Sequence, residues 1–223
     1  MKILAINGSP RGSRSQTLRL VRAVLDGARS AGADVELVDV CSLQIEYCNG
    51  CQVCYERGDC IMEDDFVELY QKMLDSDGIV FGSPNYINSV TAQIKTMLDR
   101  MADAIHCQAF IGKYGCAVAT AGGSGADEVV TYLNGVLRTL GATTVGGVGV
   151  VLGGDPEEAI VPAEGRAYEL GKRLAQAIAK KETYPEQEEF HAEMQIRMQA
   201  LVTANKDRWQ HEYDYWKAAG RIP

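Results

Sequence analysis

The sequence predicts an α/β domain built on a doubly wound, five-stranded parallel sheet that carries helices on both faces. Short β-branched or apolar runs alternate with longer segments of helical period along residues 1 to about 180. Such alternation favours a parallel sheet, because every helix returns the chain to the edge from which the next strand starts. A sheet of this kind binds ligands at the carboxyl ends of its strands.

The predicted strands are short and mostly end at Gly, Pro or Asp. They span residues 3–6, 35–40, 78–81, 115–119 and 143–151. The segments between and after them are long enough for helices that cross from one strand to the next. We expect these helices at 16–31, 64–75, 90–104, 126–140 and 156–180.

A different pattern begins after residue 181, where a segment around Pro185 interrupts the last helix. We therefore divide the chain into a main domain at 1–181 and a helical extension at 182–223. The extension carries an apolar stripe of helical spacing, which either packs on the main domain or forms an oligomerisation arm. Both tryptophans of the chain lie in it, as in many interfaces. The stripe consists of Phe190, Met194, Met198, Leu201, Val202, Trp209, Tyr213 and Trp216.

The net charge of the chain limits the kinds of molecule that it is expected to bind. The formal net charge is -8 and no basic run occurs, whereas nucleic acids and anionic membranes attract clustered Lys and Arg. We therefore expect small-molecule or protein partners, with neither nucleic acid nor membrane. Residues 1–6 begin a strand directly, without a leader-like segment, so we expect a cytoplasmic protein.

Four of the seven cysteines follow the pattern Cys48-x2-Cys51-x2-Cys54-x5-Cys60, inside a cysteine-rich loop at 41–63. The odd total and a reducing compartment favour metal ligands or nucleophiles over disulfides. Four thiolates at this spacing suit a 4Fe-4S cluster. A structural zinc ion or a metal-free, redox-sensing loop would explain them as well.

The other cysteines and the histidines are not expected to bind a metal. Three cysteines lack metal-ligand spacing and are expected to pack as small apolar residues. They are Cys41, Cys107 and Cys116. The histidines are scattered, so we expect surface or helix-end residues rather than catalysts or metal ligands. They are His106, His191 and His211.

The loop after the first strand has the composition of a phosphate site. It is rich in glycine, hydroxyl and arginine side chains and opens directly into a predicted helix. Main-chain N–H groups and the dipole at a helix start favour an anion there, and Arg11 or Arg14 supplies charge. Neither a Walker lysine nor a G-x-G-x-x-G motif occurs, which argues against nucleoside triphosphate hydrolysis and a standard Rossmann site.

Two further loops are expected at the same end of the sheet, after the third and fourth strands. The first, at 82–89, offers a proline-stiffened backbone with an aromatic side chain. The second, at 120–125, offers glycines that let main-chain N–H groups approach a planar heterocycle. Together the three loops predict a site for a flat ring that carries a phosphate.

These motifs resemble those of the NAD(P)H-dependent FMN reductases, which belong to the flavodoxin-like superfamily. The resemblance covers residues 1 to about 180 and rests on Gly8-Ser9-Pro10-Arg11 with Ser15-x-Thr17, Gly82-Ser83-Pro84-x-Tyr86, and Thr120-Ala121-Gly122-Gly123. It implies a flavodoxin-like domain with strand order 2-1-3-4-5, FMN as cofactor, and a homodimer or homotetramer.

The resemblance also implies two groups of FMN-binding residues. The phosphate is expected on Ser9, Arg11, Ser15, Gln16 and Thr17. The isoalloxazine ring is expected against Pro84, Asn85, Tyr86, Ile87, Thr120, Ala121, Gly122, Gly123 and Ser124. A bound flavin carries the redox chemistry itself, so no catalytic side chain is expected.

The cysteine loop follows the second strand, a placement that resembles the iron–sulfur flavoprotein branch of the same superfamily. This implies a 4Fe-4S cluster held by Cys48, Cys51, Cys54 and Cys60. We expect an FMN-dependent oxidoreductase that passes electrons between FMN, the cluster and an external partner such as ferredoxin. One alternative is a cluster-free FMN or quinone reductase that uses NAD(P)H, with NADH or NADPH left open. The other is a flavodoxin-type carrier or redox sensor without turnover.

Overall fold

The computed structural model describes residues 1–222, in which five strands form one sheet. All neighbouring strands are parallel, in the order β2-β1-β3-β4-β5. The predicted fold class and strand order are therefore confirmed. The strands are β1 (Lys2–Asn7), β2 (Asp34–Asp39), β3 (Gly78–Pro84), β4 (Tyr114–Ala121) and β5 (Thr143–Val151).

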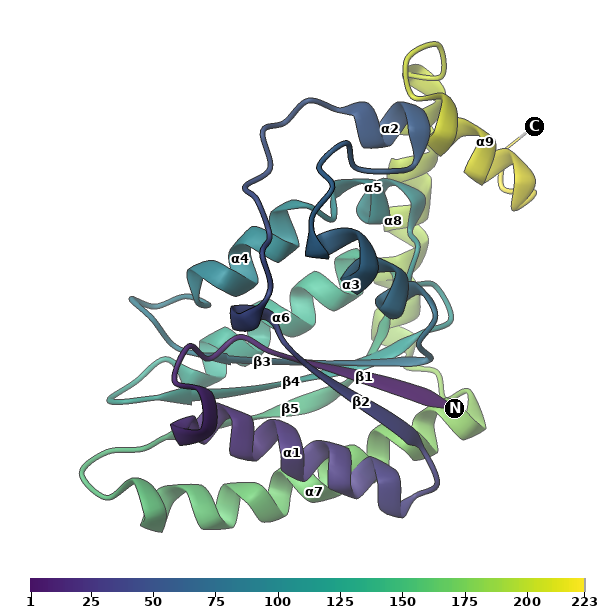
Figure 1. The fold of residues 1–223 in the computed structure, drawn as a ribbon. Coiled ribbons are helices and arrows are strands. Elements are labelled where there is room, and N and C mark those ends of the chain that lie inside the picture. The colour runs from purple at the N-terminus through teal and green to yellow at the C-terminus, as the bar shows by residue number, and fades with distance from the viewer. Residues whose placement is uncertain (223) are drawn as a thin grey trace.

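Helices cover both faces of the sheet (Figure 1). On one face, α1 (Gln16–Ser30) and α7 (Pro156–Lys180) lie side by side. The opposite face carries α3 (Asp65–Leu74), α4 (Ala92–Asp99) and α6 (Ala126–Thr139). The carboxyl ends of the strands meet at one edge of the sheet, where the loops singled out in the sequence leave it.

Each strand sends side chains alternately into two cores, one under each helical layer. In β1, Ile3 packs with the α1–α7 layer, whereas Leu4 and Ile6 pack with the α3–α6 layer. Because both faces of the sheet are buried, the strands appear in the sequence as continuous apolar runs rather than alternating ones. The same two-sided burial places Cys116 of β4 fully inside the protein, as expected for a small apolar residue.

The predicted helix at 90–104 is wrong, because two helices occupy this segment. After α4 ends at Asp99, α5 (Ala102–Cys107) begins. The N–H groups of Arg100 and Met101 bond carbonyls three residues earlier, each at 3.1 Å, which tightens the last turn and ends α4. The Arg100 side chain turns into the protein at this break, and its contacts supply the physical reason for it.

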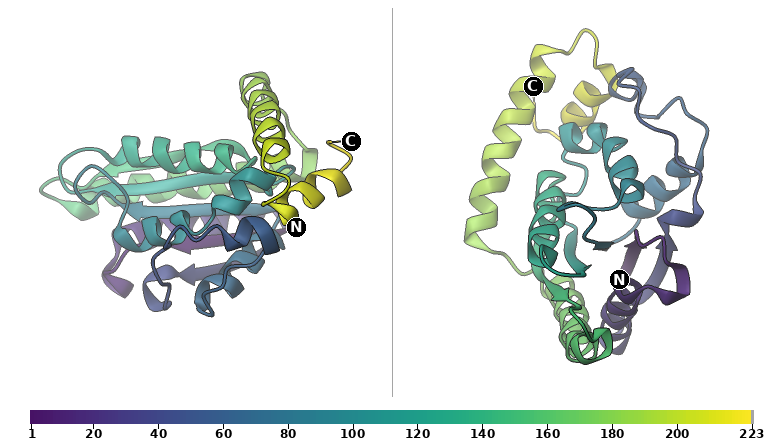
Figure 2. Two further views of the ribbon diagram at one scale, coloured as in Figure 1. Left: turned by 90° about the horizontal axis from the view of Figure 1, so that it is seen from above. Right: turned by 90° about the vertical axis from the view of Figure 1, so that its left-hand side faces the viewer.

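The extension forms α8 (Pro185–Ala204) and α9 (Gln210–Ala218), which stand against one end of the main domain (Figure 2). The buried members of its apolar stripe, Met198, Val202 and Trp216, form a small core of their own. The indole N–H of Trp216 donates to the carbonyl of His106 in α5 at 2.8 Å. The extension thus packs on its own chain, and a role as an oligomerisation arm stays a prediction.

Within residues 1–222, no helix combines the length and the apolar character needed to cross a bilayer.

Two glycines allow α1 and α7 to touch backbone to backbone. A Cβ on Gly27 would lie 1.9 Å from the carbonyl oxygen of Tyr168, and one on Gly171 would lie 1.9 Å from that of Val24. No side chain fits at either position without moving a helix. Gly165 of α7, by contrast, has no neighbour within 4 Å of such an atom.

We predict that Gly171→Ala lowers the free energy of unfolding by about 1–3 kcal/mol, because the added methyl group overpacks the helix crossing. Gly165→Ala on the same helix should instead raise it by about 0.5–1 kcal/mol, since alanine favours helix and meets nothing there. Urea denaturation of both variants measures the difference. Equal effects of the two substitutions would contradict the close crossing.

Candidate functional site

A cavity of about 120 Å³ opens at the carboxyl ends of the strands. Its walls come from the three loops predicted to bind a phosphate and a flat ring, joined by the residue that follows β5. The cavity is lined by Ser9, Arg11, Gln16, Thr17, Pro84, Asn85, Tyr86, Thr120, Ala121, Gly122 and Leu152. Sequence reasoning missed Leu152, although the carboxyl end of β5 necessarily lies at this edge.

Hydrogen bonds between the loops hold the cavity together. The hydroxyls of Thr17 and Thr120 lie 2.7 Å apart, which joins the start of α1 to the end of β4. The main-chain N–H of Asn85 donates to the Thr120 carbonyl at 2.7 Å. The hydroxyl of Thr91 donates to the Gly8 carbonyl at 2.8 Å. Loops that are far apart in the sequence therefore form one rigid wall.

Gly8 is required by close packing at this point. A Cβ there would lie 2.1 Å from Cγ1 of Ile94 in α4. Only glycine lets the loop after β1 run this close to the helix.

Four of the predicted FMN-binding residues do not line the cavity. The Ser15 hydroxyl caps α1 by accepting the Leu18 N–H at 3.0 Å. Ile87 is 99% exposed, and Gly123 is exposed as well. The Ser124 carbonyl accepts a hydrogen bond of 2.7 Å from the Asn85 side chain, so it shapes the loop from outside.

The donor groups of this cavity fit an FMN phosphate and ring. Arg11 offers positive charge to an anion. The hydroxyls of Ser9 and Thr17 offer O–H donors, and the start of α1 offers main-chain N–H donors. The side chain of Asn7, at the end of β1, is fully buried, and neither of its polar atoms has a hydrogen-bond partner among the described residues. The Oδ1 atom of Asn85 is buried and unpartnered in the same sense. Such groups are typical of a site that binds a polar ligand.

The four clustered cysteines surround a second, smaller cavity. Cys48 and Cys51 are exposed, whereas Cys54 and Cys60 are half-buried. All four line this cavity together with Arg100. The short helix α2 (Val53–Arg57) carries Cys54.

The loop bends where the sequence has glycine. Gly50 and Gly58 have φ angles of 69° and 85°, in the left-handed region that glycine favours. The bends return Cys60 toward the other three cysteines, since all four line the same cavity. Burial raises the pKa of the Cys54 thiol to about 12, and the charge of Asp103 adds to the shift. A bound cation would offset this effect, because metal ligation stabilises thiolates.

Arg100 closes the neck of the cysteine loop. Its Nη1 atom donates to the Glu46 carbonyl at 2.9 Å and to the Asp64 carboxylate at 2.7 Å. Its Nη2 atom donates to Asp64 at 3.1 Å and to the Sγ atom of Cys60 at 3.2 Å. One side chain, 1% exposed, thereby bonds the residues before and after the cysteines as well as one of the sulfurs.

Asp64 has two roles at this neck. Its carboxylate accepts the N–H groups of Phe66, as the cap of α3, and of Glu46. Burial alone would raise the pKa of Asp64, but the hydrogen bonds from Arg100 and the main chain outweigh burial and hold the pKa below its usual value. Asp64 is thus an ionised cap and an ion-pair partner.

The extension also contacts the cysteine loop. The ring of Tyr55 in α2 lies 4.9 Å from that of Trp209 and 4.7 Å from that of His106. The His211 ring occupies the space beside Gly58, where a Cβ would come within 2.6 Å of it. The expectation of surface or helix-end histidines is therefore incomplete: His106 lies in the last turn of α5, but it packs on Tyr55, and His211 packs beside Gly58.

Comparison with known proteins shows the family to which the chain belongs. Residues 1–157 match the family model described as NADPH-dependent FMN reductase. The chain belongs to the NADPH-dependent FMN reductase family. This FMN reductase family member is therefore an FMN-dependent oxidoreductase of flavodoxin-like fold, as the sequence predicted.

Its full-length relatives include iron–sulfur flavoproteins. One from Archaeoglobus fulgidus is 34% identical over 227 residues, and one from Clostridioides difficile is 26% identical over 226 residues. Each alignment covers 100% of both chains. Among solved structures, an archaeal flavodoxin aligns with a TM-score of 0.55 and 16% identity, over 80% of this chain and 99% of the flavodoxin, which supports the fold alone.

Proposed function

We propose that this FMN-dependent oxidoreductase holds a 4Fe-4S cluster on Cys48, Cys51, Cys54 and Cys60 and passes electrons between FMN, the cluster and an external partner. The observation that carries the proposal is the convergence of the four sulfur atoms on one cavity, with the Arg100 guanidinium 3.2 Å from one of them. When bound, FMN exchanges electrons in pairs or singly, and a 4Fe-4S cluster exchanges them singly.

The spread of the sulfur atoms favours a cluster over a zinc ion. Four thiolates on one zinc ion lie only about 3.8 Å apart, because each Zn–S bond is about 2.3 Å long. Within residues 1–222, no three of these four sulfurs lie within 4.8 Å of one another. A cubane binds each cysteine through a different iron atom and holds the sulfurs farther apart.

The FMN site would use the residues that line the larger cavity. Ser9, Arg11, Gln16 and Thr17 would bind the phosphate, with Ser15 holding the start of α1 in place. Residues 84–87 and 120–124 would contact the ring. Main-chain N–H groups near Gly122 and Gly123 would stabilise negative charge on the reduced flavin.

The partner and the assembly are part of the proposal. The external donor or acceptor is a protein such as ferredoxin, or a small molecule such as NAD(P)H, acting in the cytoplasm. Exposed apolar side chains border both sites, namely Ile87, 99% exposed, and Tyr47, 77% exposed. Their exposure supports a homodimer or homotetramer in which another subunit covers them.

We predict that Arg11→Gln weakens FMN binding about 10- to 100-fold, because a charge-assisted hydrogen bond to the phosphate is lost. Arg14 lies in the same loop and is exposed, but it does not line the cavity, so Arg14→Gln should change the affinity little. Quenching of FMN fluorescence on titration with flavin-free protein measures both affinities. An equal loss in the two variants would mean that the loop supplies only general positive charge.

We predict that anaerobic reconstitution gives roughly four iron and four sulfide per chain, and that Cys51→Ser abolishes this binding. Cys41→Ser is the matched control, because Cys41 lies in the same segment but outside the cysteine cavity. Iron and sulfide analysis with absorption spectra measures the result. Flavin reduction by NAD(P)H without any bound iron would favour the cluster-free reductase, and no reduction by NAD(P)H or ferredoxin would favour a sensor.

We predict that Arg100→Lys lowers the reduction potential of the cluster by tens of millivolts, because hydrogen bonds to the ligand sulfurs stabilise the reduced state. Lysine keeps the positive charge but cannot make the forked contact with Asp64 and Cys60. Arg57→Gln is the control, since it removes an exposed charge from α2 without touching a sulfur contact. Potentiometric titration followed by electron paramagnetic resonance measures both. An unchanged potential in Arg100→Lys would contradict the role of this hydrogen bond.

A further inference from the structure

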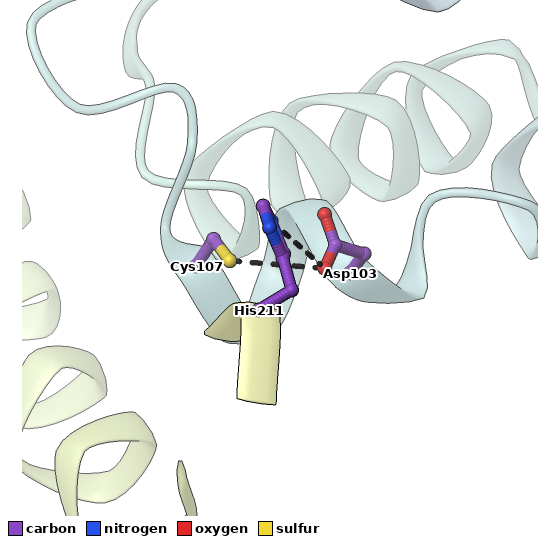
Figure 3. Close-up of side chains that lie close together, drawn as sticks. All are labelled: Asp103, Cys107 and His211. Atoms are coloured by element: carbon purple, nitrogen blue, oxygen red, sulfur yellow. Dashed lines mark hydrogen bonds and ion pairs between the residues drawn. The ribbon is translucent and has the colours of Figure 1, made fainter. Parts of the chain in front are cut away.

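A second group of metal-type donors lies beside the cysteine loop. Asp103 and Cys107 stand one turn apart on α5, and His211 of α9 faces them (Figure 3). The Oδ1 atom of Asp103 is 3.8 Å from the Sγ atom of Cys107 and 3.7 Å from the Nε2 atom of His211. All three donor atoms lie within 4.8 Å of one another. Their convergence was invisible in the sequence, because His211 follows Asp103 by more than a hundred residues.

The contacts within this group do not satisfy the carboxylate. The 3.7 Å separation from His211 is too long for a hydrogen bond, and the thiol of Cys107 is a weak donor at 3.8 Å. Asp103 is nevertheless 7% exposed, and burial is the main cause that raises its pKa to about 7. A buried carboxylate with such weak hydrogen-bond partners lacks the positive charge that would stabilise its ionised form.

A second buried carboxylate, that of Glu212, adds to the uncompensated negative charge. Glu212 is fully buried, and its Oε2 atom has no hydrogen-bond partner among the described residues. Its other oxygen lies 2.9 Å from Nδ1 of His106. The charge of Glu212 also contributes to the raised pKa values of both Asp103 and Cys107.

The donor set has the chemistry and the spacing of a zinc site. Zinc binds thiolate, imidazole and carboxylate at about 2.0–2.3 Å in tetrahedral geometry, which places ligand atoms about 3.3–3.8 Å apart. The separations of 3.8 Å and 3.7 Å from the Asp103 oxygen lie within this range, and the third separation is at most 4.8 Å. The His211 side chain is 32% exposed, which gives an ion a path from solvent and leaves room for a water molecule as fourth ligand.

We propose that Asp103, Cys107 and His211 bind one zinc ion that fastens α9 to α5. Because His211 also packs against Gly58, the ion would hold the extension in place beside the turn that precedes Cys60. This site lies beside the proposed cluster but shares no ligand with it, and its test does not depend on the cluster.

The test uses the full-length chain with Cys48→Ser and Cys51→Ser, which disables the cysteine loop at its two exposed positions. Cobalt(II) serves as a spectroscopic probe of the zinc site. We expect one cobalt per chain, with the visible bands of four-coordinate cobalt, a thiolate-to-cobalt charge-transfer band, and displacement of both by equimolar zinc. Adding Cys107→Ala should remove the charge-transfer band. Adding His211→Gln should weaken binding by at least about tenfold, since loss of even an outer partner of a metal ligand costs that much.

His191→Gln is the matched control, because His191 is a half-buried histidine of α8 outside the group and its loss should leave cobalt binding unchanged. Circular dichroism verifies that each variant folds, and the nearly isosteric Asp103→Asn replaces Cys107→Ala if the latter does not. The absence of cobalt binding overturns the proposal. A charge-transfer band that survives Cys107→Ala also overturns it, because the metal would then sit on Cys54 and Cys60.

Discussion

The buried ion pair between Arg100 and Asp64 is the contact on which the cysteine loop depends. It joins the chain before the cysteines, the chain after them and the Cys60 sulfur through one guanidinium group. Breaking a buried pair of this kind typically costs about 3–5 kcal/mol, because it leaves a charge without a partner. The loop is therefore closed at its neck by the protein itself, before any ligand is considered.

The parallel sheet builds the larger cavity, and the helical extension supports the cysteine loop. The sheet brings the loops after β1, β3, β4 and β5 to one edge and thereby builds the cavity predicted to bind FMN from the main domain alone. The cysteine loop leaves that edge after β2 and rises beside α4 toward α9 (Figure 1). There the aromatic contact of Tyr55 with Trp209 and His106 supports its far end. The extension is thus part of the environment of the cysteines, whether or not it also joins subunits.

Sequence reasoning succeeded where local pattern and sheet geometry decide the outcome. The strands and the gathering of their loops at one edge follow from alternating apolar runs and from the rule that parallel strands end together, whereas the strand order and the individual FMN-binding residues were implied by the resemblance to the FMN reductases. It failed where tertiary contacts override local preference. Residues 90–104 have a continuous helical pattern, yet the helix breaks at Arg100 because that side chain finds partners at Glu46 and Asp64. Leu152 and the approach of His211 to α5 were missed because both need the folded arrangement.

Cysteine density indicates a metal site, but the distances between donor atoms decide which kind of metal fits. One ion draws all its ligands to a single centre, so its donors lie within about 4 Å of one another. Two of the three separations among Asp103, Cys107 and His211 meet this condition, whereas the four clustered sulfurs surround a cavity and, within residues 1–222, no three of them come within 4.8 Å of one another. A cubane offers a separate iron atom to each thiolate, and a loop bent at Gly50 and Gly58 can present sulfurs from several directions. The neighbouring groups are therefore suited to different ligands, although both contain cysteine.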